Sequence, residues 1–423
     1  MATQPKASGL GAQIPAGARR IARLAEQSAL ARAQRWFAQE HCWIDEQHLQ
    51  LCRIAAPTFF EQRRAEWLRA RMETLGWRAR LDRAGNVLAA FGNESSEPLL
   101  AICAHLDTVF APTRPEEVYF GQGGRLFGPG AADNGSGLTA LLALARVLAE
   151  IPELHPLASS LLLVANVGEE GEGNLSGMRH LCRPSGPLSG ASAILVLDGP
   201  SADHITTQAL ASRRFEIGFA GPGGHSWNDY GTPNPIHALG AFIAGFLETA
   251  GERAGPGRRR ACSFNFGIVE GGASVNSIPS EARAKLDVRS EEPALIEDLA
   301  NSLAPLVERS LEKENRAARS GHLTGKIKEL GSRPGGRLPE HSPLLVTIQA
   351  VDAYLHIRSV VGCASTDANI PLSLGLPALS IGAGGRGGGA HTRQEWYEPD
   401  GRELGLRRIL LIAAALARQD DAS

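Results

Sequence analysis

Histidines and acidic residues that can bind metal ions recur in five short segments of the chain. These segments contain His105 with Asp107, Asp133, the pair Glu169 and Glu170, Asp198, and His391. Histidine nitrogens and carboxylate oxygens are ligands of catalytic zinc, which also keeps one position open for water. The residue types therefore predict metal-assisted hydrolysis if the fold brings the five segments together.

The first segment has the geometry of a metal-binding histidine and its orienting carboxylate. In AHLD, His105 and Asp107 flank a leucine at the end of an apolar run. Residues two apart on a strand point to the same side, so Asp107 can hold the ring of His105 in place. The alternative is a hydrogen bond at a strand end with no metal nearby, and this motif taken alone favours that alternative.

Counting the ligands predicts two metal ions. If Asp133 bridges both ions, His105 and Asp198 complete one site. Glu170 and His391 then complete the other site. Each ion has three protein ligands and an open position, which is the composition of a catalytic zinc site.

One carboxylate, Glu169, stays outside this ligand set. A free carboxylate beside a metal-bound one is suited to act as the general base. The alternative for the pair Glu169 and Glu170 is a solvated acidic turn, and Asp133 in DNG is open to a turn assignment too. The sequence VANVGEEGEG places the acidic pair directly after an apolar strand, where a solvated turn is less expected.

The elements around these segments predict an α/β fold. LLAICAH, LLLVANV and AILVL are apolar runs typical of buried strands, and LTALLALARVLAE is typical of a helix. Strands that alternate with helices indicate a mainly parallel sheet covered on both faces. Such sheets bind ligands beyond the carboxyl ends of their strands, where the acidic residues and histidines lie. Before them, residues 19–51 predict one or two amphipathic helices and residues 61–75 another.

A second unit interrupts this pattern at residue 211. Its strands and helices follow the order β-α-β-β-α-β, the split βαβ sandwich of ferredoxin-like α+β domains. We therefore expect a disordered N-terminus at 1–18 and the first part of the catalytic domain at 19–210. An inserted domain at 211–330 and the second part of the catalytic domain at 331–423 complete the prediction.

Composition predicts a cytoplasmic protein without a nucleic-acid or membrane partner. Lys and Arg total 43 against 45 Asp and Glu, so the chain has no overall basic excess. The six cysteines are scattered and form no C-x-x-C pair, which is typical of reduced thiols. No apolar segment resembles an export signal or a membrane span.

The ordered motifs AHLDTV, GAADNGSG, GEEGEGNLSG, LDG, GPGGHS and AHTRQEW resemble those of the dimerisation-domain zinc metallopeptidases. That family includes peptidase T, carboxypeptidase G and acetylornithine deacetylase. STDAN followed by PLSLGLP looks most like the peptidase T branch. The resemblance covers the chain from about residue 44 onward. It implies an α/β catalytic domain with an inserted lid or dimerisation domain, two divalent metal ions, and a homodimer formed through that domain.

The resemblance also implies residue roles. His105, Asp133, Glu170, Asp198 and His391 would bind zinc, with cobalt or manganese as alternatives. Asp107 would orient His105, and Glu169 would be the base. One departure is that Asn134 follows Asp133, where the family often has lysine or aspartate.

Four further residues would contact the substrate by the same resemblance. His225 would polarise the scissile carbonyl, in dimeric members from the partner chain. Asn276 and Arg289 would hold the substrate, and Asp367 would bind its polar end. The alternatives are a loop-structuring histidine, an asparagine that caps a turn, a surface arginine and an aspartate in a turn.

The expected activity is hydrolysis of a peptide bond in a small peptide. An N-acyl amino-acid deacylase with the same metal site is the nearest alternative. A non-catalytic metal- or ligand-binding protein of the same fold is the alternative from another class. Its hallmark would be a missing ligand or base, and none is missing here.

Overall fold

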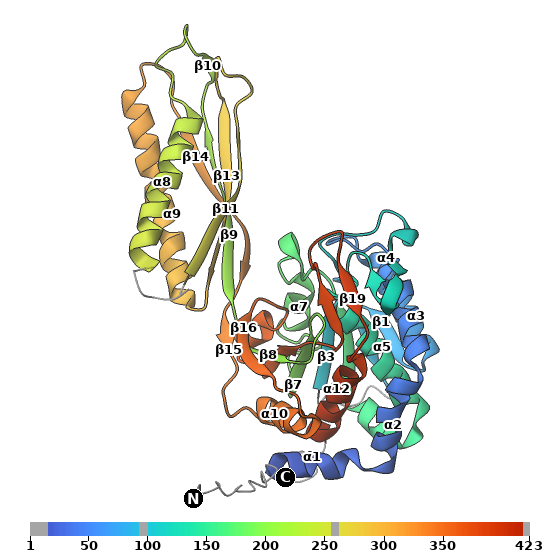
Figure 1. Cartoon of the computed structure of the whole chain (residues 1–423). Helices are drawn as coiled ribbons and strands as arrows, with labels where there is room; N and C mark the ends of the chain where they lie inside the picture. Colours follow the sequence, from blue (N-terminus) through green and yellow to red (C-terminus); the bar gives the residue numbers. More distant parts are fainter. Residues whose placement is uncertain (1–15, 93–99, 255–261, 418–423) are drawn as a thin grey trace, which may run out of the picture.

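The computed structural model describes residues 16–92, 100–254 and 262–417. They form a large α/β domain and an elongated second domain, residues 211–333, which we call the lid (Figure 1). The lid projects from the large domain, and the N- and C-terminal helices lie at the opposite end of the molecule. No helix among the described residues combines the length and the apolar character that a bilayer-spanning segment needs.

A nine-stranded sheet forms the centre of the large domain. Its order is β1 (Arg78–Leu81), β2 (Val87–Ala90), β6 (Leu161–Asn166), β3 (Leu100–His105), β7 (Ala193–Leu197), β17 (Ala378–Ile381), β8 (His204–Ala209) and β15 (Gly336–Arg337), with β16 (Val360–Ala364) also paired to β8. The central strands β6, β3, β7 and β17 are parallel. Their carboxyl ends therefore meet at one edge of the sheet.

Ten α-helices belong to the described part of the large domain. They are α1 (Ala16–Ala25), α2 (Ser28–Gln39), α3 (His41–Cys52), α4 (Gln62–Thr74), α5 (Gly135–Glu150), α6 (His155–Ser159), α7 (Ser176–Leu181), α10 (Pro343–Leu355), α11 (Asn369–Ser373) and α12 (Arg402–Ala417). Helices α5 and α12 pack against β3 and against each other. Both are apolar around most of their circumference, as expected of helices covered on all sides.

The N-terminal region is more ordered than the sequence predicted. Residues 1–15 lie outside the described residues, but α1 begins at Ala16 and Ala18 is fully buried. The predicted disorder is therefore wrong for residues 16–18, because this turn packs against α10 and α12. The segment 19–51 holds three helices instead of one or two, with breaks near residues 26–27 and 40.

The lid has the predicted order β-α-β-β-α-β. Its elements are β9 (Ala211–Ala220), α8 (Pro235–Ala254), β11 (Cys262–Gly271), β13 (Glu281–Ser290), α9 (Pro293–Ala317) and β14 (Thr324–Arg333). The strands form an antiparallel sheet in the order β11-β13-β9-β14, and α8 and α9 pack side by side on it. Phe219, Phe242 and Phe246 are buried between the sheet and the helices. The predicted fold class, an α/β domain with an inserted α+β unit, is confirmed.

Short elements complete the two domains. The lid tip carries a two-stranded ribbon of β10 (Gly224–His225) and β12 (Ser277–Ile278). A small antiparallel sheet, which the sequence did not predict, joins β18 (Arg386–Gly388), β19 (Trp396–Glu398), β5 (Leu126–Phe127) and β4 (Tyr119–Phe120). Single 3-10 turns lie at η1 (Pro115–Glu117), η2 (Gln122–Gly124), η3 (Pro152–Leu154) and η4 (Gly171–Gly173).

Candidate metal centre

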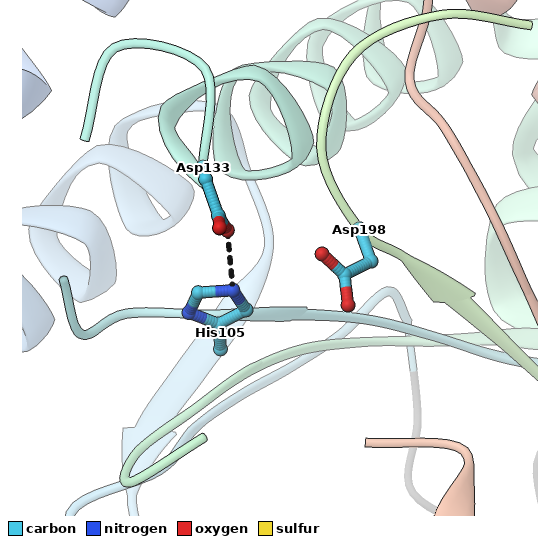
Figure 2. Close-up of side chains that lie close together, drawn as sticks. All are labelled: His105, Asp133 and Asp198. Atoms are coloured by element: carbon cyan, nitrogen blue, oxygen red, sulfur yellow. Dashed lines mark hydrogen bonds and ion pairs between the residues drawn. The ribbon is translucent and has the colours of Figure 1, made fainter. Parts of the chain in front are cut away.

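The five predicted ligands converge at the carboxyl edge of the parallel strands. His105 ends β3, Asp198 follows β7, and Glu170 lies in the loop after β6. Asp133 comes from the loop before α5, and His391 comes from the loop after β18. Donor atoms of His105, Asp133 and Asp198 all lie within 4.8 Å of one another, and so do those of Asp133, Glu170 and His391. Figure 2 shows the first of these groups.

Asp133 lies between the two histidines and belongs to both groups. Its Oδ1 is 3.0 Å from Nε2 of His105, and its Oδ2 is 3.1 Å from Nε2 of His391. Nε2 of His391 is also 3.1 Å from Oε1 of Glu170. Each oxygen of Asp133 therefore faces a different histidine, the arrangement that a carboxylate shared between two cations requires.

The ring of His105 is fixed by Asp107. Nδ1 of His105 donates to the backbone carbonyl of Asp107 at 3.0 Å and lies 3.5 Å from its Oδ1. A carbonyl oxygen can only accept, so the proton sits on Nδ1 and Nε2 is directed into the centre. The predicted orientation of His105 by Asp107 thus has a geometric basis.

Asp107 also holds the loop that follows β6. Its two carboxylate oxygens accept the backbone N–H groups of Glu169 at 2.9 Å and Glu170 at 2.8 Å. Thr58 Oγ1 donates to Asp107 as well, at 3.0 Å. Asp107 is fully buried, so three hydrogen bonds from two loops converge on one desolvated carboxylate. One residue therefore positions both the histidine and the acidic pair.

Two buried residues position the loop of Asp133. Glu395 accepts the backbone N–H groups of Gly130, Ala132 and Asp133 at 2.7–2.8 Å. Asn134 donates to the carbonyl of Leu197, the residue before Asp198, at 2.8 Å. An aspartate at position 134 could not make this donation, which gives the departure at Asn134 a structural reason.

The centre concentrates negative charge in a desolvated space. Burial, together with the charge of Asp133, raises the pKa of Asp198 to about 7. Burial also raises the pKa of Glu169 well above its ordinary value. Hydrogen bonds to Asp133 and Glu170 raise the pKa of His391 to about 10. The pKa of His105 is raised too, because its hydrogen bonds to Asp107 and Asp133 outweigh the effect of burial. Both histidines are therefore protonated beside the carboxylates.

This donor set fits divalent cations. Two imidazole nitrogens and three carboxylates, one of them shared, match the ligands of zinc, and carboxylate-rich sites also suit manganese. The second nitrogen of His105 has its hydrogen-bond partner, as metal-binding histidines require. A bound cation would also offset the carboxylate charge that the protonated histidines now balance.

Glu169 has a partner that the sequence did not predict. Nη1 of Arg333 lies 2.9 Å from Oε1 of Glu169, and Nη2 of Arg333 donates to the Glu169 carbonyl. Both side chains are almost fully buried. Arg333 is a single arginine in GSRPGG, so neither spacing nor a neighbouring motif marked it. Glu395, by contrast, lies in the AHTRQEW motif, where its acidic character was a usable signal.

The lid residues lie away from this centre. His225 is at the lid tip, the end farthest from the large domain (Figure 1). Asn276 accompanies it there, because its carbonyl accepts the N–H of Ser226 at 3.0 Å. Arg289 is near the other end of the lid, at the end of β13, where its Nε donates to Asp287 at 2.7 Å. The structure thus brings His225 and Asn276 together and separates both from Arg289 and from the metal centre of their own chain.

Asp367 is buried instead of facing a substrate. It has no exposed surface, and its Oδ2 accepts Nδ2 of Asn166 at 2.6 Å. Its Oδ1 has no hydrogen-bond partner among the described residues. Burial raises the pKa of Asp367 to about 6. Direct contact with the polar end of a substrate, as the family resemblance implied, does not agree with this burial.

Sequence profiles match both domains. The profile "Peptidase family M28" matches residues 86–213, and "Peptidase dimerisation domain" matches residues 211–315. The Escherichia coli protein "Cytosol non-specific dipeptidase" is 28% identical over 298 residues, which are 64% of this chain and 58% of the dipeptidase. The chain thus spans somewhat more than half the length of this curated relative.

Solved structures share the fold across nearly the whole chain. A tripeptidase from Staphylococcus aureus superposes with a TM-score of 0.70 at 18% identity, covering 89% of this chain and 98% of its own. A Bacillus subtilis protein described as a dinuclear metal-binding peptidase of the M20 family has a TM-score of 0.64 at 15% identity, covering 90% and 99%. A peptidase profile over residues 86–213 and a peptidase dimerisation domain over residues 211–315 thus accompany a fold that this chain shares with M20 peptidases.

Proposed function

We propose that this protein hydrolyses peptide bonds of small peptides with the help of two divalent metal ions, most simply zinc. One observation carries the proposal. Asp133 is shared between two groups of histidine and carboxylate donors, and Glu169 adjoins them without belonging to the predicted ligand set. His105, Asp133 and Asp198 would hold one ion, and Asp133, Glu170 and His391 the other.

When bound, the two ions would activate a water molecule and polarise the scissile carbonyl. Glu169 would accept the proton of the attacking water and pass it to the leaving nitrogen as the amide bond breaks. Its burial supports this role, because desolvation raises the proton affinity of a carboxylate. Asp107 would keep His105 and the acidic loop aligned during the reaction.

His225 can donate a hydrogen bond through Nε2. Its Nδ1 accepts the backbone N–H groups of Trp227 and Asn228, each at 3.3 Å. The neutral ring therefore carries its proton on Nε2. A donor of this kind stabilises the oxyanion that forms at the scissile carbonyl. Because the lid tip is remote from its own metal centre, we propose that His225 acts at the centre of a second copy of the chain (Figure 1).

The lid offers a surface for this dimer. Strand β11 is an edge of the lid sheet, and Ile268 and Val269 on it are 43% and 59% exposed. On α8, Leu247 is 47% exposed. An exposed apolar edge strand is a site for pairing with another chain. These features, with the dimerisation-domain profile over residues 211–315, support a homodimer formed through the lid.

The surface beside the metal centre favours a substrate with an apolar side chain. Phe59 and Phe60 are 64% and 72% exposed and directly follow Thr58, which bonds Asp107. Phe110 is 38% exposed and is covered in part by the guanidinium of Arg393, 5.5 Å from its ring. Burying such rings against a substrate side chain is favourable because it removes apolar area from water.

We also propose a cytoplasmic location, supported by six free cysteines.

A substrate panel tests this function. The protein is loaded separately with Zn²⁺, Co²⁺ and Mn²⁺ and assayed on di- and tripeptides and on N-acetyl and N-succinyl amino acids. Faster turnover of peptides supports the proposal, and faster turnover of acylated amino acids identifies a deacylase instead. Binding of metal without turnover of any member would favour the non-catalytic alternative, which the complete set of ligands and base argues against.

A further inference from the structure

The loop that carries Glu169 is attached to the lid at several points. We call residues 169–174 the base loop, because Glu169 is the proposed base. From β9, Arg214 donates to the carbonyl of Gly171. From β13, Lys285 lies 3.4 Å from Glu172. Three strands of the lid contact this loop, since β14 does so as well.

The attachment through β14 is the most buried. Its last residue, Arg333, donates to both the carboxylate and the carbonyl of Glu169. Ser332, directly before it, donates its N–H to Oδ1 of Asn174 at 3.0 Å. Arg333 is 7% exposed and Glu169 is 5% exposed. The two ends of the base loop are therefore each held by neighbouring residues of one lid strand.

The lid strands form one continuous hydrogen-bonded sheet. Arg333 pairs with Ser212 of β9, and β9 pairs along its whole length with β13. A continuous hydrogen-bonded sheet transmits displacement instead of absorbing it. The base loop, in contrast, contains Gly171 at positive φ and directly follows Gly168, also at positive φ, so the backbone can readjust at these two glycines. If the lid rotates, we therefore expect the base loop to change its conformation while the lid sheet keeps its own.

We propose that Arg333 is a positioning residue that couples the orientation of the lid to the alignment of Glu169. The inference rests on the proposed function, in which Glu169 is the base. A guanidinium that holds both the carboxylate and the backbone of one residue fixes its position and its direction at once. Lid closure over a substrate and alignment of the base would then be a single event.

Substitution of Arg333 tests this coupling. In Arg333→Met we expect kcat to fall by about 10- to 100-fold with KM changed by less than about threefold, because misplacing a catalytic group affects chemistry more than binding. In Arg333→Lys we expect part of kcat to return, since one ammonium can reach the carboxylate but not also the carbonyl. Metal content should equal wild type in both. Arg337→Met is the matched control, an exposed arginine four residues later, and should leave kcat unchanged.

Amide hydrogen exchange of the full-length protein provides a readout independent of turnover. Exchange in residues 169–174 should accelerate in Arg333→Met and, to a smaller degree, in Arg333→Lys, which keeps the test decisive if the methionine variant folds poorly. A rise in KM with kcat preserved would instead make Arg333 a substrate ligand and overturn the proposal. Unchanged exchange in the base loop would overturn it too. If the wild type hydrolyses no peptide, the proposed function fails while the exchange measurement still decides the coupling.

Discussion

At the scale of single residues, direct contacts between side chains hold the centre together. Asp133 reaches two histidines through its two oxygens, and Asp107 fixes a histidine ring together with the backbone of the acidic pair. Glu169, in contrast, is held by an arginine, Arg333. The different partners of neighbouring glutamates explain how two adjacent carboxylates can serve different purposes.

The role of Glu169 predicts a loss of chemistry without a loss of metal. Glu169→Gln should lower kcat by about 10²- to 10⁴-fold, the range expected when a general base is removed. Metal content, measured by elemental analysis, should equal wild type because Glu170 and the other predicted ligands remain. Glu116→Gln, an exposed glutamate of the same domain, serves as the control and should retain full activity. Activity of Glu169→Gln close to wild type would refute the assignment.

The charged groups of the centre predict how the metal-free protein responds to pH. Asp198 and Glu395 have pKa values raised to about 7, chiefly by burial, and His391 has one raised to about 10 by hydrogen bonds. Each group binds its proton more tightly in the folded than in the unfolded chain. Its stabilising contribution is complete below the unfolded pKa and is lost as pH rises through the folded pKa.

The metal-free protein should therefore become less stable between about pH 5 and pH 9. Thermal unfolding in the presence of a chelator measures this, and the melting temperature should decrease across the range. Saturating zinc should widen the difference between loaded and metal-free protein as pH rises, because protons then compete less for the ligands. A melting temperature that stays level or increases with pH in the chelator would contradict the charge distribution described here.

At the scale of secondary-structure elements, parallel strands bring the ligands to one edge and the loops fix their directions. β3, β6 and β7 end beside one another. His105 is the last residue of β3, Asp198 directly follows β7, and the acidic pair lies in the loop after β6. Asp133, in contrast, does not follow a strand of this sheet but lies in the loop before α5. It is held by Glu395, which stands directly before β19 of the small sheet and accepts three backbone N–H groups.

Removing this support should weaken both the fold and the metal site. Glu395→Ala leaves three buried N–H groups without an acceptor, at a cost of about 1–3 kcal/mol for each group that water cannot reach. Metal affinity should fall by about 10- to 100-fold, as is typical when the support of a ligand is lost. Calorimetry of unfolding and of zinc binding measures the two effects.

The control for this variant is a glutamate of the same small sheet whose ion pair lies at the surface. Glu398, the last residue of β19, forms an ion pair of 3.5 Å with Arg125, and Glu398→Ala removes this pair. Such an exposed pair contributes less than about 1 kcal/mol, so stability and metal affinity should stay near wild type. Equal losses in both variants would mean that general damage to the small sheet, and not the loop of Asp133, causes the effect.

At the scale of the whole molecule, the lid separates residues that the proposed reaction needs together. His225 and Asn276 are at its tip, whereas Arg289 and Arg333 are near its junction with the large domain. The tip extends away from the metal centre of the same chain (Figure 1). A complete active site would therefore draw on two chains, with the base from one and the oxyanion donor from the other.

Mixing two inactive variants tests this arrangement. His225→Ala and Glu169→Gln should each lose activity, by about 10²- to 10³-fold for the oxyanion donor. After the subunits are mixed and exchanged in equal amounts, half of the dimers are heterodimers with one intact site of two. Activity should recover to about a quarter of wild type, as a symmetric dimer with shared sites requires. No recovery, despite exchange shown by a labelled subunit, would mean that each chain works alone.

The sequence alone determined which histidines and carboxylates are the predicted ligands, the strand ends that carry them and the class of both domains. Apolar runs that end in His105, Glu169 or Asp198 are local signals, because a buried strand followed by a polar residue can be read from neighbouring positions. The order β-α-β-β-α-β of the lid followed from periodicity in the same way.

Only the tertiary structure decided which distant residues support the centre. Arg333 meets Glu169 across 164 positions, and Glu395 meets the loop of Asp133 across more than 260. Nothing in a local pattern reports such a contact, because it depends on how two domains and a small sheet pack. The same reason applies to Asp367, which the resemblance made a substrate contact but which is fully buried and accepts a hydrogen bond from Asn166. Burial is a property of the packed chain, and it separates a substrate ligand from a structural carboxylate.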